Sequence, residues 1–150
     1  MLGGAARYSA TDAGYGVRLL AEALREAPKA LRPQLRKALA TSGSTMRQAA
    51  AANASWSRRI PKSLVVRTKF SGARPGVYII ARRSVAPHAR PIEGITGVDK
   101  FRHPLFGDTE HWYDQPTRPF LAKAVEDKGD AAIREIQDGL EAALRSVGLK

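Results

Sequence analysis

The chain has few large apolar side chains from which to build a hydrophobic core. Leu, Ile, Val and Phe together supply 32 of its 150 residues, whereas Ala alone supplies 25. That share of large apolar residues lies just above the roughly 20% below which a strongly charged chain is expected to be disordered. Burial stabilises by about 25 cal/mol per Å² of apolar surface, and an Ala side chain has little surface to bury. One domain of this length therefore has a thin core, and we expect a partner to supply further burial.

Several classes of protein do not fit the sequence. No run approaches the ~18 apolar residues of a membrane-spanning helix, and the first ten residues lack the apolar segment of a secretory signal. The chain has no cysteine, which excludes disulfides, thiolate metal sites and a cysteine nucleophile. We therefore expect a protein made in a reducing cytoplasm, with no membrane partner.

Charge is divided unevenly along the chain. Residues 1–104 carry 19 Lys/Arg against 5 Asp/Glu, whereas residues 105–150 carry 6 against 9. A basic segment can neutralise nucleic-acid phosphates and release their counterions. Alternatively, the basic part of one subunit can dock on the acidic part of the next, and such head-to-tail contacts can close into rings. A solvated basic surface that maintains solubility is the third interpretation.

The N-terminal part is predicted to be helical. Residues 1–10 are rich in Gly and Ala without periodicity, so we expect a flexible arm there and a single domain over residues 11–150. One helix is predicted from a cap at Thr11 or Asp12 to a stop at Pro28. A second helix is predicted over about residues 32–53, where Gly43 should cost roughly 1 kcal/mol relative to Ala. Its apolar stripe ends in small side chains, which allow another element to approach closely: Leu31, Leu35, Ala38, Leu39, Thr45, Met46, Ala49 and Ala50.

The pattern changes to strands after residue 60. Residues 63–70 and 77–82 are rich in β-branched and aromatic types and flank turn-forming residues, which predicts a β-hairpin. Residues 83–100 are expected to be irregular, with room for one helical turn. A last helix is predicted from Pro119 to about Val147, and Gly129 and Asp130 mark a point where it could divide. Because helices and strands are segregated, we predict an α+β fold: a small, mostly antiparallel sheet packed with N-terminal helices and a long C-terminal helix.

No residue pattern indicates catalysis or a bound cofactor. A metal site could be drawn from two histidines and two aspartates in one stretch: His103, Asp108, His111 and Asp114. Their spacing matches no common ligand pattern, and packing is the favoured role for both histidines. Glu110 and Asp114 are close in sequence, but nothing near them would desolvate one and solvate the other, as an acid–base pair requires. We therefore predict a non-enzymatic protein with no metal and no cofactor.

The strongest local signal is aromatic. Half of the ten aromatic residues fall between positions 101 and 120. Prolines and glycines interrupt this stretch, so the simplest prediction is two strands joined by a turn at residues 106–108, the second strand ending at residues 115–116. The hairpin can complete the core, or it can anchor a subunit interface, where aromatic and Arg side chains dominate the binding energy. The core is favoured for Trp112 and the interface for Phe106.

This stretch, FRHPLFGDTEHWYDQPTRPFL, resembles a signature of tailed-bacteriophage (siphophage) neck and tail-completion proteins. The family shows an aromatic-Arg-His-Pro-hydrophobic-Phe-Gly run, then a Trp, then Gln-Pro and an aromatic residue that enters a C-terminal helix. Leu105 and Phe120 match this pattern, and Glu93-Gly94 matches an upstream pair to which we assign no role. The other matching positions form the predicted subunit and partner interface: Phe101, Arg102, His103, Pro104, Phe106, Gly107, Trp112, Gln115 and Pro116.

The resemblance implies a structural virion protein of a long-tailed phage or prophage, without catalysis or cofactor. Such proteins resemble ring-forming joints, commonly six-fold, that complete or cap the tail tube and join it to the head connector. The implied partners are further copies of the chain, the tail tube protein and a head-side connector or stopper, and genomic DNA can pass through the ring. The implied location is the virion neck, after synthesis in the host cytoplasm. Whether the layer is the tail terminator, the tail-completion factor or the stopper stays open.

A nucleic-acid-binding module is the alternative prediction. It would follow phosphates with the basic residues 25–37 and with the Lys/Arg at positions 58, 59, 62, 67 and 69, and Trp56 and Phe70 would stack on bases. If the neck-protein prediction holds, Phe106→Ala leaves the subunit folded but separates heads from tails. A core position for Trp112 would make Trp112→Ala cost about 3–5 kcal/mol of stability.

Overall fold

The computed structural model describes residues 29–71, 76–94, 98–105 and 107–148. The predicted arm at residues 1–10, the predicted first helix and Phe106 lie outside these ranges. The predicted α+β class is confirmed, with the elements in the following order: a short 3-10 helix (Lys29–Leu31), α2 (Arg32–Asn53), α3 (Ile60–Ser63), β1 (Leu64–Lys69), β2 (Gly76–Ala81), α4 (Ala89–Glu93), β3 (Lys100–Leu105), β4 (Asp108–Pro116) and α5 (Leu121–Ser146).

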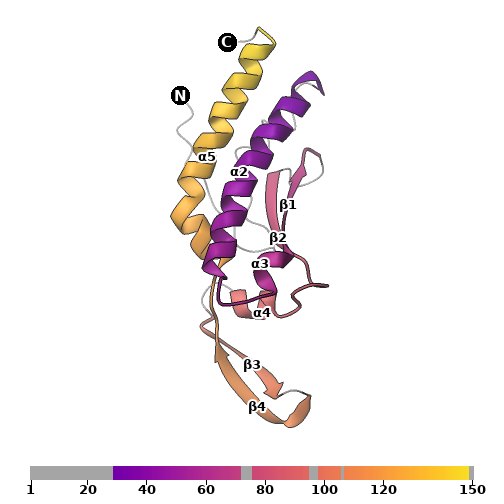
Figure 1. Ribbon diagram of the computed structural model, residues 1–150, viewed down its shortest axis with the longest axis vertical. Helices are drawn as coiled ribbons and strands as arrows, with labels where there is room; N and C mark the ends of the chain where they lie inside the picture. The colour runs from indigo at the N-terminus through magenta and orange to yellow at the C-terminus, as the bar shows by residue number, and fades with distance from the viewer. Residues whose placement is uncertain (1–28, 72–75, 95–97, 106, 149–150) are drawn as a thin grey trace.

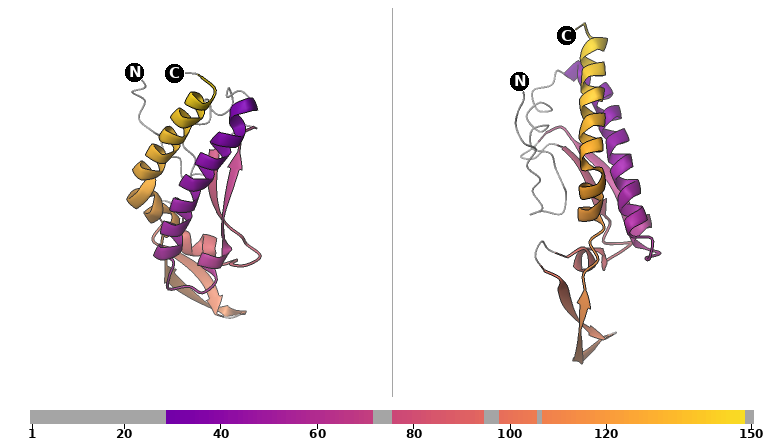
Figure 2. Two further views of the ribbon diagram at one scale, coloured as in Figure 1. Left: turned by 45° about the horizontal axis from the view of Figure 1, so that its top comes forward. Right: turned by 90° about the vertical axis from the view of Figure 1, so that its left-hand side faces the viewer.

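The two long helices, α2 and α5, lie side by side along the molecule (Figures 1 and 2). Small residues let their backbones approach, because a Cβ atom at Gly139 of α5 would collide with the Cβ of Ala38 of α2. The buried Ser42 hydroxyl of α2 donates a hydrogen bond of 3.0 Å to the carbonyl oxygen of Ala132 of α5. The sequence predicted close approach at the Ala-rich C-terminal end of this helix, whereas these contacts to α5 lie at Ala38 and Ser42 in its first half.

The antiparallel hairpin of β1 and β2 packs on α2. Gly43 makes this contact possible, since a Cβ atom there would collide with the side chains of Val66 in β1 and Val77 in β2. Gly43 therefore lowers the helix propensity of α2, as predicted, but it also provides the space that the hairpin needs. A larger residue would not fit between helix and hairpin. Two apolar clusters fill the body. One surrounds Phe120 and Ile60 at the end near α3 and α4, and the other surrounds Leu39 and Phe70 toward the opposite end.

Helix α5 is continuous from Leu121 to Ser146. The sequence marked Gly129 and Asp130 as a point where the helix could divide, but it does not divide there, and Gly129 is buried within it. The helix also begins later than predicted: Phe120 is its N-cap residue, and Pro119 precedes it. Among the described residues, no helix has both the length and the apolarity to span a membrane.

The strands form two separate two-stranded sheets rather than one. Strands β3 and β4 pair with each other and extend beyond the helical body (Figures 1 and 2). Neither strand contains a buried residue. The favoured core position of Trp112 is therefore wrong, since its relative exposure is 46%. The physical reason is that this hairpin leaves the body, so none of the described helices covers either of its faces.

Candidate functional site

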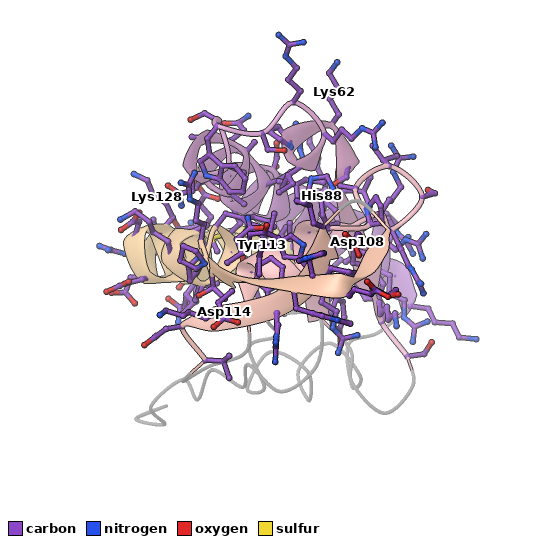
Figure 3. The ribbon with its side chains drawn as sticks, turned by 90° about the horizontal axis from the view of Figure 1, so that it is seen from below. Lys62, His88, Asp108, Tyr113, Asp114 and Lys128 are labelled. Atoms are coloured by element: carbon purple, nitrogen blue, oxygen red, sulfur yellow. The ribbon has the colours of Figure 1, made fainter. Side chains whose placement is uncertain are left out.

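The candidate site is the hairpin that extends from the body, made of β3, β4 and the turn between them. We call this hairpin the arm; it is distinct from the flexible segment predicted at residues 1–10. The antiparallel register places residues of the two strands opposite each other, and opposite residues share a face. Figure 3 shows Tyr113 and Asp114 on opposite sides of β4. One face therefore carries Phe101, His103, Tyr113 and Gln115, and the other carries Arg102, Pro104, Trp112 and Asp114.

Aromatic side chains on both faces of the arm contact a neighbour on the same face. The rings of Phe101 and His103 are 5.6 Å apart between centroids. On the other face, the Arg102 guanidinium carbon lies 5.9 Å from the ring centre of Trp112, within range of a cation–π contact. Large surfaces of the second strand stay open, with Tyr113 exposed by 49%. The arm thus presents aromatic surface without burying it.

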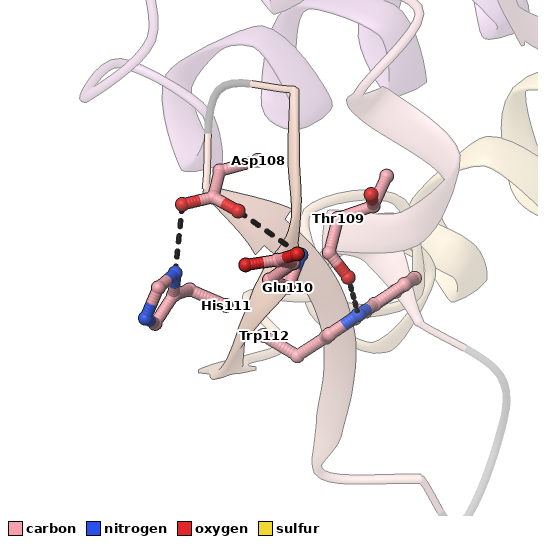
Figure 4. A network of polar contacts seen from close by, with 5 residues as sticks. All are labelled: Asp108, Thr109, Glu110, His111 and Trp112. Carbon is pink, nitrogen blue, oxygen red and sulfur yellow. Dashed lines mark hydrogen bonds and ion pairs between the residues drawn. The ribbon is translucent and has the colours of Figure 1, made fainter.

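A local network orders the first half of β4 (Figure 4). The Asp108 carboxylate accepts a hydrogen bond of 3.0 Å from the backbone N–H of Glu110 and one of 2.7 Å from Nδ1 of His111. The indole N–H of Trp112 donates to the carbonyl oxygen of Thr109 over 2.8 Å. The His111 hydrogen bond is the main cause that lowers the pKa of Asp108 below its ordinary value of 3.8. All of these contacts are local to the first half of β4.

The expected packing role does not hold for His111, whose side chain is 67% exposed. His103 is half-buried, and its Nδ1 lies 3.0 Å from the carbonyl oxygen of Pro104. Within the described residues, no three His, Asp or Glu side chains gather in a way that could hold a metal ion.

The root of the arm is tied firmly to the body. Thr117 donates its backbone N–H to the carbonyl oxygen of Asp99 over 2.8 Å, which closes the base of the hairpin. Next to it, the Arg118 N–H donates to the carbonyl oxygen of Ile92 over 2.7 Å. The arm therefore leaves the body through fixed connections to α4.

Glu93 completes this anchor. Its carboxylate accepts hydrogen bonds from the first backbone N–H groups of α5, at 2.7 Å from Phe120, 2.9 Å from Leu121 and 2.8 Å from Ala122. These groups lack partners within a helix, and a negative charge at this end is favourable. The sequence alone indicates no role for Glu93, because its partners lie almost thirty residues away.

The structure brings the predicted interface residues together on the arm. Four of them are half-buried (Phe101, His103, Pro104 and Gln115), and four are exposed (Arg102, Gly107, Trp112 and Pro116). Phe106 lies outside the described residues, between strands that end at Leu105 and begin at Asp108. The prediction omitted Tyr113, which is among the most exposed large side chains of the arm. The position of Tyr113 within the aromatic-rich stretch of residues 101–120 could have indicated its membership of this surface.

A second surface lies on the body beside the root of the arm. Residues 27–92 contain fourteen Lys/Arg and no Asp or Glu. The basic charge of residues 1–104 is therefore concentrated in this run. Exposed members of this run lie around α3, the loop after β2 and α4, and we call them the basic end: Arg58, Arg59, Lys62, Arg82, Arg83 and Arg90. The Arg82 guanidinium reaches the carbonyl oxygen of Lys62 at 3.5 Å, which joins two of these segments. No ion pair within the described part of the chain involves the basic end.

Comparisons of the chain with protein-family models, with curated proteins and with solved structures found no match. The likeness of residues 101–121 to phage neck proteins therefore stays a prediction from the sequence.

Proposed function

We propose that the chain is a structural subunit that assembles with copies of itself into a ring at the head–tail junction of a long-tailed phage. The observation that carries this proposal is the arm, which is anchored at its root but has no buried residue in either strand. An isolated two-stranded hairpin is marginally stable in water. An arm with a fixed root and open aromatic residues is therefore suited to be covered by a partner, where such side chains contribute most to binding.

The composition of the core supports the same proposal. The cluster around Phe120 includes five alanines among its buried residues: Ala50, Ala54, Ala86, Ala89 and Ala124. Small side chains bury little apolar surface, so the stability of the isolated subunit is limited. Covering the arm in an assembly would add burial that the monomer lacks.

The resemblance supplies the proposed setting. In the phage proteins that the sequence resembles, the ring is commonly six-fold. It completes or caps the tail tube and joins the tube to a head-side connector or stopper. Genomic DNA passes through its lumen, and the protein resides in the virion neck after synthesis in the host cytoplasm. The role is assembly rather than catalysis and needs no cofactor.

The test is deletion of the gene in the phage or prophage that carries it, followed by electron microscopy of the lysate. We expect filled heads and free tails that are not joined, and joining restored by the wild-type gene. A variant with Trp112→Ala and Tyr113→Ala should be produced at normal levels and fail to restore joining. Matched substitutions on the exposed surface of α5, Lys128→Ala and Ala142→Ser, should restore it. Intact tailed particles from the deletion would rule the proposal out.

The basic end supports nucleic-acid binding as the second candidate, because uncompensated cations attract phosphates. Only one of the two aromatic residues expected to stack on bases is exposed. Phe70 is buried, with the Arg36 guanidinium 4.9 Å from its ring centre, whereas Trp56 is 42% exposed and has Arg118 at 5.3 Å from its ring centre. Binding to duplex DNA that weakens steeply with added salt, together with joined particles from the deletion, would favour this candidate.

A further inference from the structure

The outer part of the arm is acidic as well as aromatic. Residues 105–114 contain Asp108, Glu110 and Asp114 and no Lys or Arg. The facing strand contributes Arg102, which pairs with Asp114 in the strand register and whose guanidinium carbon lies 5.9 Å from the ring centre of Trp112. All three carboxylates are exposed, and Trp112 and Tyr113 lie between them in β4. We call this segment the acidic tip. The three carboxylates outnumber the single guanidinium of Arg102, so this surface stays negative and attracts a basic protein surface.

The basic end of the body has the complementary character. Its exposed cations have no ion-pair partner within the described residues. The nearest carboxylate in the sequence, Glu93, is already engaged by three backbone N–H groups of α5. Among the described residues, the cations of the basic end therefore have no counter-charge, and an acidic partner would provide one.

One chain thus carries both halves of a charge-complementary contact. The arm leaves the body beside α4 and extends away from it, so the acidic tip lies beyond its own body (Figures 1 and 2). We propose that the acidic tip of one copy docks on the basic end of the next copy. The proposal rests on the proposed function, since it identifies the contact through which that assembly forms.

The geometry of such a contact has a consequence for assembly. The acidic tip and the basic end are different surfaces, so each copy can contact one neighbour with its tip and another with its body. Contacts of this head-to-tail type generate a closed ring when the rotation between copies closes, and otherwise an open filament. A two-fold dimer could satisfy both surfaces only by a reciprocal exchange, with each tip on the basic end of the other copy. Trp112 and Tyr113 would provide the apolar centre of the contact, with charges around them.

Cross-linking tests the proposal directly, because the chain has no cysteine of its own. One variant carries Thr109→Cys at the acidic tip and a second carries Ser84→Cys in the loop of the basic end. Both positions are exposed. Oxidising the mixture at assembly concentration should produce a cross-linked dimer that contains one chain of each kind. The matched control replaces Ser84→Cys with Ala142→Cys on the exposed surface of α5, and it should not cross-link to the tip.

Charge reversal provides a second, independent test. Glu110→Lys with Asp114→Lys at the tip should reduce cross-linking by about tenfold or more, because like charges across an interface cost several kcal/mol. Adding Arg82→Glu and Arg83→Glu to the Ser84→Cys chain should restore it. Loss without restoration, with both variants folded by circular dichroism, would overturn the proposed pairing.

The outcomes separate this inference from the proposed function. If the deletion separates heads from tails but the tip never cross-links to the basic end, the chain joins the particle through another contact and this inference is wrong. If the deletion leaves particles intact while the tip does cross-link, the docking contact stands and the phage role fails. If the basic end binds duplex DNA and the tip-to-body cross-link is absent at every concentration, the basic end serves nucleic acid and the docking proposal is overturned.

Discussion

The carboxylate of Glu93 lies 2.7 Å from the backbone nitrogen of Phe120, and Phe120 is itself fully buried. This contact joins the end of α4 to the start of α5. The whole arm lies between these two helices in the sequence, since it leaves the body after α4 and returns to it before α5. The contact therefore fixes the N-terminus of the longest helix and the base of the arm at the same time.

Glu93→Ala should lower the free energy of unfolding by about 2 kcal/mol, because three helix-terminal N–H groups lose their charged acceptor. Urea denaturation monitored by circular dichroism measures this change. The control is Glu126→Ala, which removes an exposed carboxylate of α5 and should change stability by less than about 0.5 kcal/mol. Equal stabilities for the two variants would contradict the capping role.

Trp112→Ala should leave the fold almost unchanged, since nearly half of the side chain is already exposed. Phe120→Ala should cost about 3–5 kcal/mol, because that ring is fully buried among the core residues. Thermal melts of the two variants provide the comparison. A Trp112→Ala variant that melts as early as Phe120→Ala would mean that the arm packs on the body in solution.

Gly43→Ala should destabilise the protein by about 1–3 kcal/mol through overpacking. Helix propensity alone predicts the opposite sign, a gain of roughly 1 kcal/mol. The packing effect should win because the added Cβ would collide with Val66 and Val77. Gln48→Ala, at an exposed position of the same helix, should be neutral or slightly stabilising. Calorimetry of both variants decides between the two effects, and a stabilised Gly43→Ala would refute the close approach.

His111→Ala should raise the pKa of Asp108 toward its ordinary value of 3.8, because the hydrogen bond that chiefly lowers it is lost. In the wild type, the ionised carboxylate keeps this contact at pH values above 3.8, and the contact is lost as pH falls through the lowered pKa. NMR titration of the side-chain carboxyl carbon measures the value. The control is His103→Ala, which removes the other histidine of the arm and should leave the titration of Asp108 as in the wild type. Equal pKa values of Asp108 in the two variants would mean that His111 is not what lowers it.

Local patterns in the sequence were sufficient to predict most of the elements. The apolar period of residues 32–53 indicated α2, and the β-branched runs on either side of a turn indicated β1 and β2. Likewise, the turn chemistry near residue 107 divided the aromatic stretch into β3 and β4. These features depend on neighbours within a few residues, and that is the range over which periodicity and turn propensity act.

The tertiary structure decided where those elements go. Trp112 is exposed although its residue type favours burial, because the direction of the arm is set at its root and not within the strand. Gly43 was predicted to weaken its helix, but partners distant in sequence make it a point of close contact. Glu93 had no visible role until α5 lay against α4. In each case the deciding neighbour is separated by twenty or more residues, so its influence is absent from any local window of the sequence.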